Sequence, residues 1–535
     1  MPYPLINPTL KTIGMAAAVS GLLAVYIVAV GIYPAFAARQ ILPPSLTLGY
    51  LMLAGVWFYT GWTYARSGSW LNGGIGAGTT GVVSGAVYVS VLELAKTENI
   101  QGIFVSLSAP TINSAFFGLS GVTAFIVIPL CTGVLSLAGF LIANTPSRVR
   151  SCFLSAFVGI LLAALLRDLW TALFSNLTGT RRWASWIYAA GGLTWIGAAV
   201  AALAGVAFQF ARSRRMDNGG RGGDIGAVVV FVLIAIVIPY FTNAFVAQVM
   251  LLVGLYALMG MGLNLELGLA GLLDLGFVAF FAIGAYAMAL LSADAPIAIA
   301  RLTFWEALPI ATICAALGGF VFGLPVLRVR GDYLALATLG LGEIVRILVV
   351  SDFMASTLGG AQGIVAVPRP SLGDTPMTSQ LSMYYLTLAL SALVAIAGYR
   401  LRHSPIGRAW MAARDDEDAA ATLGVDLVKS KLKAYVLGAA FAGIAGALFA
   451  STLGSVFPQS FKLDVSINVL ALLVIGGLGS LPGVFVGSLI LIGMPEFLRE
   501  FGEFRYLFYG VLLILVMRLR PSGLWPSSLK ARGEI

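Results

Sequence analysis

One apolar run of the chain reads Phe245-Val-Ala-Gln-Val-Met-Leu-Leu-Val-Gly-Leu-Tyr-Ala-Leu-Met-Gly-Met-Gly-Leu-Asn-Leu265, and similar runs recur along its 535 residues. A helix of about 20 apolar residues spans the hydrocarbon layer of a membrane. Within that layer the backbone must satisfy its own hydrogen bonds, so each run predicts a transmembrane helix. The alternation typical of a membrane β-barrel is absent. The sequence therefore predicts an all-α fold, a polytopic bundle of transmembrane helices.

Composition supports this fold class and excludes others. Hydrophobic residues make up 59% of the chain and charged residues 10%, and the mean hydropathy is +0.94. No soluble core could bury so many apolar side chains, whereas lipid can solvate them. The net charge of +9 comes mainly from residues between the apolar runs, so the positive-inside rule explains it better than nucleic-acid binding does. Cys131, Cys152 and Cys314 have neither metal-ligand spacing nor a disulfide framework, which indicates packing roles.

We expect about sixteen spans, six in residues 1–220 and ten in residues 225–525. The basic, glycine-rich stretch Arg212–Asp224 is the predicted boundary between the two groups. The run that follows Lys11 is interpreted as a first span and not as a signal peptide. The expected spans are Ile13–Ala37, Leu46–Tyr64, Ile75–Leu94, Leu119–Ala143, Cys152–Phe174, Ala184–Phe210, Ile225–Phe241, Phe245–Leu265, Leu272–Leu291, Ala307–Leu327, Leu334–Val350, Met383–Tyr399, Ala434–Thr452, Ser466–Leu478, Val484–Phe497 and Tyr506–Met517.

Arginine clusters indicate the topology of these spans. With the N-terminus inside, the clusters follow even numbers of spans, which predicts that both ends are cytoplasmic. Arg181 and Arg182 are the exception. The two short spans that flank Gly476–Gly483 have a second interpretation, as half-helices. The clusters are Arg148 and Arg150, Arg212 to Arg215, Arg328 and Arg330, Arg400 and Arg402, and Arg518 and Arg520.

The longest polar segment between spans is Arg400–Lys433, which we expect in the cytoplasm. Ser404 followed by Pro405 is typical of a helix start. The alanine-rich stretch Arg408–Leu423 favours helix, and Gly424 is placed to end it. A short cytoplasmic helix between spans suits the docking of a partner. A solvated connector is the alternative.

Within this segment, Asp418-Ala-Ala-Ala-Thr-Leu-Gly424 resembles the EAA loop of ABC importer permeases. That loop has an acidic residue, two alanines, three further residues and a glycine. Small alanines allow a helix to seat closely in the ATPase, and the glycine turns the chain back to the membrane. Asp replaces the usual Glu here, and no Ile-x-Leu-Pro follows. The resemblance implies an ATPase-coupling loop that contains Arg408, Trp410, Asp418, Ala419, Ala420 and Gly424.

Six further segments resemble the LivM family of branched-chain amino-acid ABC permeases, over about residues 225–525. The resemblance implies an importer for branched-chain or related small amino acids in a bacterial-type inner membrane, and urea and short amides remain open as substrates. It also implies a second permease subunit, two cytoplasmic ATPase subunits and an extracytoplasmic solute-binding protein. Residues 1–220 show no such resemblance and receive no role. The segments are Gly262–Gly276, Arg328–Arg346, Gly359–Ile364, Ser404–Trp410, Gly476–Gly483 and Arg518–Leu524.

No part of the chain is suited to holding a nucleotide. A phosphate-binding P-loop requires Gly-Lys-Ser/Thr after a glycine-rich turn, and the chain has no Gly-Lys dipeptide. We therefore expect ATP on the partner subunits, and no cofactor, metal or catalytic residue on this chain. His403, the one histidine, is interpreted as an ordinary surface residue.

Charged residues at membrane depth are costly, so they indicate candidate functional positions. Asp274 lies in a glycine-interrupted run close to Asn264 and Glu266. A broken helix there would offer backbone groups to a zwitterionic solute. Alternatively, Asp274 caps a helix. The predicted translocation path comprises Asn264, Glu266, Asp274, Gly276 and Glu343.

Other charged residues at membrane depth can be explained by a structural role. Glu343 and Arg346 are spaced to pair on one helix face, and we favour mutual neutralisation over a place in the path. An ion-coupled secondary transporter, with Asp274 and Glu343 as ion carriers, is the alternative function. A lipid-modifying enzyme is disfavoured because the sequence offers no catalytic cluster.

Overall fold

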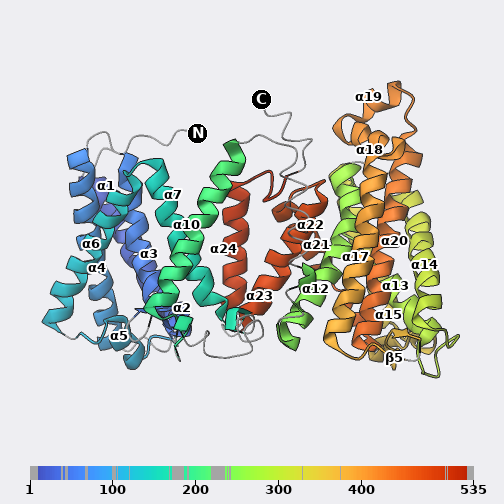
Figure 1. Cartoon of the computed structure of the whole chain (residues 1–535), viewed down its shortest axis with the longest axis horizontal. Helices are drawn as coiled ribbons and strands as arrows, with labels where there is room; N and C mark the ends of the chain where they lie inside the picture. Colours follow the sequence, from blue (N-terminus) through green and yellow to red (C-terminus); the bar gives the residue numbers. More distant parts are fainter. Residues whose placement is uncertain are drawn as a thin grey trace. The chain divides into compact units, whose positions relative to one another are not determined.

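The computed structural model is mostly helical (Figure 1). It describes residues 10–526, except 38–39, 43–45, 67–69, 99–103, 105, 120, 168, 172–185, 190–191, 218–234, 238, 240–241, 328, 330, 374, 500–501 and 503. The chain divides into two compact units, Met1–Gly226 and Ala227–Ile535, here called unit 1 and unit 2.

Within the described ranges, nine helices are long and apolar enough to cross a membrane, or ten if one bent pair is a single span. The chain is therefore a multi-pass helical membrane protein. The expected sixteen spans and the cytoplasmic location of both ends stay predictions. Three predicted spans form apolar helices of only 15 or 16 residues. Most of Ile225–Phe241 lies outside the described residues, as do Arg181, Arg182, Arg328 and Arg330.

Unit 1 is built mainly of long helices. Gly31, with φ of +89°, divides the first predicted span into α1 and α2, so that prediction of one continuous helix was wrong. The short helix α5 was not predicted. The elements are α1 (Leu10–Ala29), α2 (Ile32–Ala37), β1 (Gln40–Leu42), β2 (Leu46–Thr47), α3 (Leu48–Thr63), η1 (Tyr64–Arg66), α4 (Trp70–Thr97), α5 (Ala109–Ala115), α6 (Val122–Ala143), α7 (Ser147–Leu165) and α10 (Trp195–Asp217).

Small residues bring the helices of unit 1 into backbone contact. A Cβ atom on Gly61 of α3 would lie 1.7 Å from the Ser136 carbonyl oxygen of α6. One buried hydroxyl joins three helices, because Ser84 of α4 accepts hydrogen bonds from Ser20 of α1 (2.8 Å) and from the Trp57 indole of α3 (3.0 Å). Both features are typical of helix packing in lipid, where apolar burial alone does not drive association.

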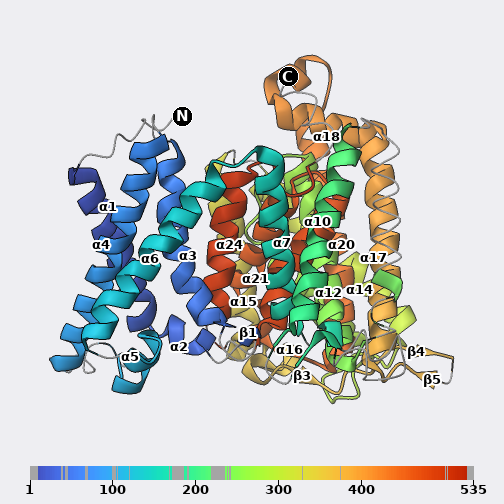
Figure 2. The same ribbon diagram turned by 60° about the vertical axis from the view of Figure 1, so that its left-hand side comes forward.

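Unit 2 is a bundle of long helices with short elements at both ends (Figure 2). Its two π-helical segments, η3 and η7, each continue a helix. The elements are α12 (Ala244–Leu263), η3 (Asn264–Leu269), α13 (Val278–Ser292), α14 (Phe304–Val326), α15 (Asp332–Val350), η4 (Asp352–Met354), α16 (Ala355–Leu358), η5 (Gly360–Gln362), β3 (Ile364–Val365), β4 (Ser371–Leu372), β5 (Thr375–Pro376), α17 (Gln380–His403), α18 (Pro405–Asp415), α19 (Glu417–Thr422), α20 (Leu427–Leu453), β6 (Ser455–Val456), η6 (Pro458–Phe461), α21 (Leu463–Gly476), α22 (Leu481–Ser488), η7 (Leu489–Gly493), α23 (Met494–Phe497) and α24 (Phe504–Leu519).

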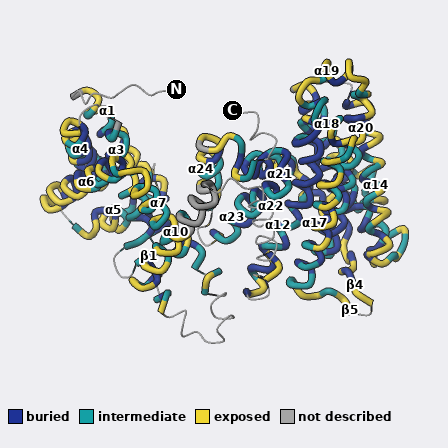
Figure 3. The backbone as a smooth tube through the Cα atoms, turned by 45° about the horizontal axis from the view of Figure 1, so that its top comes forward, coloured by how far each residue is buried: buried dark blue, intermediate teal, exposed yellow. Residues whose placement is uncertain are grey.

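Helix α20 is central to the packing of unit 2, and it contacts α12, α13 and α14. Figure 3 shows α12 and α20 as largely buried. Close approach is possible because glycines lie at the crossings. A Cβ atom on Gly446 would lie 2.0 Å from the Phe281 carbonyl oxygen of α13, and one on Gly284 would lie 2.4 Å from the Gly443 carbonyl oxygen. The core therefore depends on backbone-to-backbone contact at membrane depth.

The interpretation of two half-helices is supported. Helix α21 and the segment Leu481–Phe497 meet at 118°, as a broken span or a re-entrant loop does. The backbone N–H groups of Leu524 and Trp525 donate to the carbonyls of Ile475 and Gly476, at 2.8 and 2.9 Å. The free end of α21 is thereby satisfied by the chain that follows α24.

The two ends of unit 2 differ. Helices α18 and α19 project from one end, and the β4–β5 hairpin lies at the other (Figure 1, Figure 2). The described strands form three two-stranded antiparallel ladders, β1–β2, β3–β6 and β4–β5. The β3–β6 ladder pairs Ile364 with Val456 and so joins the segment after α15 to the end of α20.

Gly446→Ala tests this packing. The added methyl would overlap the Phe281 carbonyl, and overpacking of this kind costs about 1–3 kcal/mol. We expect a clear fall in the thermal midpoint of the purified protein in detergent. Gly340→Ala on α15 is the control, because nothing lies within 4 Å of its new methyl. Equal midpoints for the two variants would contradict the proposed contact.

Candidate functional site

The predicted broken helix is present. Helix α12 continues as the π-helical η3, and the chain then leaves helical geometry until α13 begins at Val278. Gly271 adopts a φ of +73°, which favours glycine. The span predicted from Leu272 thus starts six residues later, because residues 270–277 form an irregular connection. π-Helical segments of this type are frequent at functional sites.

Side chains from other helices satisfy the backbone of this irregular connection. The N–H of Leu275 donates to the Thr338 hydroxyl of α15, and that of Val278 donates to the Ser466 hydroxyl of α21, both at 3.0 Å. Asp274 accepts from the Gly276 N–H at 2.7 Å, which closes a turn ahead of α13. The capping alternative is therefore only partly correct, since Asp274 stabilises the turn but Phe277 is the N-cap residue of α13, and the hydroxyl that accepts from the first N–H of the helix is that of Ser466.

Gly276 lies directly against α15. A Cβ atom there would be 2.0 Å from the Thr338 carbonyl oxygen, and one on Gly342 would be 3.0 Å from the Gly276 Cα. The irregular connection of residues 270–277, here called the break, is thus held to α15 by two glycines and one hydroxyl. Bulkier residues would separate the two segments.

Three of the predicted path residues gather inside unit 2. Asn264, Glu266 and Asp274 are each at most 2% exposed. The Asn264 amide oxygen accepts from the Gly479 N–H at 2.8 Å, which ties the break to the turn between α21 and α22. Glu266 lies against α20, where a Cβ atom on Gly438 would be 2.0 Å from its Oε1. The structure brings these groups together in a closed interior.

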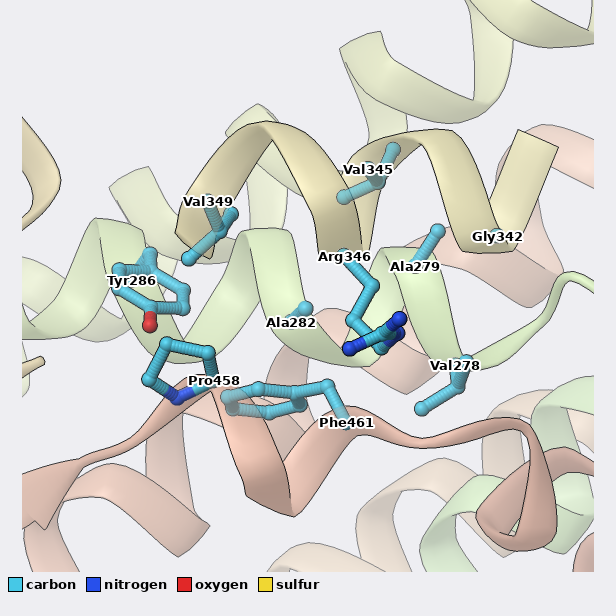
Figure 4. Close-up of a pocket in the computed structure, with 10 residues that line it drawn as sticks. All are labelled: Val278, Ala279, Ala282, Tyr286, Gly342, Val345, Arg346, Val349, Pro458 and Phe461. Atoms are coloured by element: carbon cyan, nitrogen blue, oxygen red, sulfur yellow. The ribbon is translucent and has the colours of Figure 1, made fainter. Parts of the chain in front are cut away.

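Glu343 lies apart from that cluster, on α15. Its carboxylate accepts from the Arg346 Nε at 2.9 Å, and the two side chains form an ion pair. A cavity of about 10 Å³, about the volume that one water needs, lies between α13, α15 and η6, with Arg346 and Tyr286 in its wall (Figure 4). A second cavity of similar size is lined by Leu275 and Glu343. Neither is large enough for an amino acid in this conformation.

The predicted coupling segment forms two helices. Asp416 takes an extended conformation and accepts from the Ala419 N–H at 2.9 Å, so it ends α18 and caps α19. The prediction of one helix over Arg408–Leu423 was therefore wrong at this point. The predicted start at Ser404 and Pro405 is confirmed, with the Ser404 hydroxyl accepting from the Gly407 N–H at 3.3 Å.

The coupling-loop residues divide into buried and exposed sets. Trp410 is fully buried, and its indole donates to the Ser430 carbonyl at 2.7 Å; Ala420 is also buried. Arg408, Asp418, Ala419 and Gly424 are exposed, and Gly424 has a φ of +85°. The buried residues anchor the two helices to α20. The exposed residues are thereby held in a fixed position relative to α20.

Charged contacts also hold this segment to the start of α20. Lys431 pairs with Glu417 of α19, with Nζ to Oε1 at 2.5 Å. Asp426 caps α20, and the backbone N–H and then the ammonium group of Lys429 hold the pKa of its carboxyl below the ordinary value. The Lys429–Asp426 pair is exposed and contributes little stability, whereas Lys431 is buried where it pairs with Glu417.

Sequence reasoning missed Arg414. This last-turn residue of α18 donates from Nη1 to the Gly268 carbonyl of η3 at 2.7 Å. Its side chain also covers Gly271, where a Cβ atom would lie 2.6 Å from its Cγ. A cation at a helix C-terminus interacts favourably with the helix dipole. The coupling segment thus contacts the broken helix directly, through residues 146 positions apart.

Two other positions have ordinary partners. His403 is exposed and its ring Nδ1 contacts the Tyr399 carbonyl at 2.8 Å. Arg167 donates to the Ala189 carbonyl at 3.2 Å, and Asp168 lies outside the described residues. In the part of the chain that the structure describes, no group of three His, Cys, Asp or Glu residues could hold a metal ion.

Comparison with known proteins extends this picture. The family described as "Branched-chain amino acid transport system / permease component" matches residues 245–517. The permease LivM of Escherichia coli, of a high-affinity branched-chain amino acid transport system, is 40% identical over 322 residues, 56% of this chain and 74% of its own. A probable LivM of Methanocaldococcus jannaschii is 25% identical over 52% of this chain and 93% of its own. The guanosine permease NupQ of Bacillus subtilis is 23% identical over 45% and 77%. No solved structure matches significantly.

Arg414→Ala tests the contact between α18 and the broken helix. A charge-assisted hydrogen bond contributes about 1.5–3 kcal/mol, so its loss should raise amide hydrogen exchange in residues 268–276 by about tenfold or more. Hydrogen exchange with mass spectrometry measures this. Arg408→Ala, which removes an exposed arginine of the same helix that bonds only locally, should leave the exchange unchanged. The same exchange in both variants would refute a role for Arg414.

Proposed function

This chain belongs to the family of permease components of branched-chain amino acid transport systems, and we propose that it passes a small amino acid across the membrane within an ATP-driven importer. The chain is a permease subunit and not an enzyme. The observation that carries the proposal is the family match over residues 245–517, which include every helix of unit 2 from α13 to α23 and nearly all of α12 and α24. Family membership also disfavours the ion-coupled alternative.

The substrate we propose is a branched-chain or related small amino acid. The relative with the higher identity is a branched-chain amino acid permease, whereas the guanosine permease is more distant. The proposed partners are a second permease subunit, two ATPase subunits that hold the ATP, and a solute-binding protein. A bacterial-type inner membrane is the proposed location. Residues 1–220 are proposed to form an added membrane module, to which we assign no activity.

We propose that α18 and α19 dock the ATPase. They project from one end of unit 2, and they present Leu423 at 83% exposure beside exposed Ala419 and Gly424. A leucine so exposed outside the spans, next to small residues, suits insertion into a groove of a partner. Trp410 fixes the base of this surface, so a force on α19 reaches α20.

Arg414 offers a second route from the docking helices into the membrane. It links α18 to the carbonyl end of η3, four residues from Asn264 and two from Glu266. Movement of α18 on ATP binding would therefore displace Arg414 and alter its hydrogen bond to the Gly268 carbonyl beside the break. We propose that Asn264, Glu266, Asp274 and Gly276 lie beside the translocation path and rearrange in this way, and that Glu343 faces a cavity which widens with them.

Leu423→Asp tests the docking surface. A charge in place of an apolar anchor should weaken binding of the ATPase subunits by at least about tenfold, because central apolar contacts often carry about 2 kcal/mol or more. Binding of the purified ATPase to the permease in lipid nanodiscs gives the measurement. Leu372→Asp is the matched control, since Leu372 is 63% exposed on β4 at the opposite end of unit 2. Unchanged ATPase affinity in the Leu423 variant would exclude this surface.

A further inference from the structure

Three buried side chains of unit 2 have polar atoms without a hydrogen-bond partner. Glu266 is fully buried, and neither of its carboxyl oxygens has a partner. Asp274 is 1% exposed and its Oδ2 is unpartnered. The hydroxyl of Tyr435, on α20, is also unpartnered. Tyr435 lies three residues before Gly438 on α20, where a Cβ atom would be 2.0 Å from the Glu266 Oε1. The Leu272 N–H donates to the Glu266 carbonyl at 2.9 Å, so the connection that contains Asp274 folds back beside Glu266. The three side chains are thus close enough to interact.

The charged groups of the surrounding elements are engaged elsewhere. None of the ion pairs found among the described residues includes Glu266 or Asp274. Arg414 of α18 bonds the Gly268 carbonyl and Asp415, and Lys431 of α20 bonds Glu417. Glu343 and Arg346 of α15 pair with each other, and Glu306 of α14 accepts from the Thr303 hydroxyl. Asp464 of α21, and Lys429 and Lys433 near the start of α20, are exposed.

Two ionised carboxylates cannot be accommodated here. A buried carboxylate without a cation or a donor costs several kcal/mol, and a second carboxylate beside it adds repulsion. A proton between two facing carboxyl groups removes one charge and converts the repulsion into a hydrogen bond. The Tyr435 hydroxyl can then donate to the remaining carboxylate.

We propose that Glu266, Asp274 and Tyr435 form a proton-binding site, in which the two facing carboxyl groups share one proton. The site joins the broken helix to α20, the helix that follows the docking segment. Glycine at position 438 leaves space for the Glu266 carboxyl beside α20, because any side chain there would collide with Glu266. The site binds its proton regardless of which solute the permease carries, so this inference does not depend on the proposed substrate.

Infrared spectroscopy of the full chain in lipid nanodiscs tests the proposal. At pH 7, in buffer free of Na⁺ and K⁺, we expect one buried carboxylic-acid C=O band that Glu266→Gln abolishes. The amide that this substitution introduces mimics a protonated carboxyl, so the variant should fold. Glu343→Gln, which removes a half-buried and ion-paired carboxylate, should leave the band unchanged.

Asp274→Asn provides a second test. Loss of the acceptor carboxylate should shift the Glu266 band, because the shared hydrogen bond is gone. An acid band that neither variant changes would overturn the proposal, as would the absence of any acid band at pH 7. Disappearance of the wild-type band on addition of Na⁺ or K⁺ would also overturn it, since the site would then bind a metal cation in place of the proton.

Discussion

The break after α12 imposes one constraint on the rest of unit 2: backbone groups that leave a helix at membrane depth must find partners within the protein. The structure meets this requirement with side chains from three separate helices. Thr338 and Ser466 accept from the backbone of the connection, and Arg414 donates to the Gly268 carbonyl near the end of η3. These bonds tie helices α15, α18 and α21 to the break.

The same bonds explain how distant parts of the chain are linked. The half-helix turn reaches the break through Gly479 and Asn264, and the docking segment reaches it through Arg414. Helix α20 contacts both parts: Trp410 of the docking segment packs against its start, and its Gly438 lies against Glu266 of the broken helix. Rearrangement at either end of this network would alter the hydrogen bonds of the break, which suits the break to coupling. Glu343 and Arg346 neutralise each other on α15, as the sequence favoured.

The sequence predicted the features that are set by local pattern. Apolar runs located most long helices, because length and hydropathy decide membrane insertion. Glycines at 476–483 indicated the half-helices, and Ser404-Pro405 indicated the start of α18. The division at Asp416 was missed because Ala-rich helix propensity concealed the capping ability of a single Asp. The division at Gly31 was missed because one glycine in an apolar run is usually tolerated.

Tertiary contacts could not be predicted in this way. A sequence pattern shows that Arg414 is basic and near a helix end, but not that its partner is Gly268. Similarly, Glu266 and Asp274 were chosen because charges at membrane depth are costly. Their separation by an irregular turn, and the placement of Tyr435 opposite them, depend on how α20 packs through Gly438.

The most direct test is thiol accessibility of the break in the assembled importer. Single cysteines from Leu263 to Ala285, in a background without Cys131, Cys152 and Cys314, would be probed with a water-soluble thiol reagent with and without ATP. If this segment lies beside the translocation path, residues on one face should react, and their reactivity should change with ATP. Uniform protection of the whole segment in both states would contradict this account and leave the glycines and the buried carboxyls with a packing role alone.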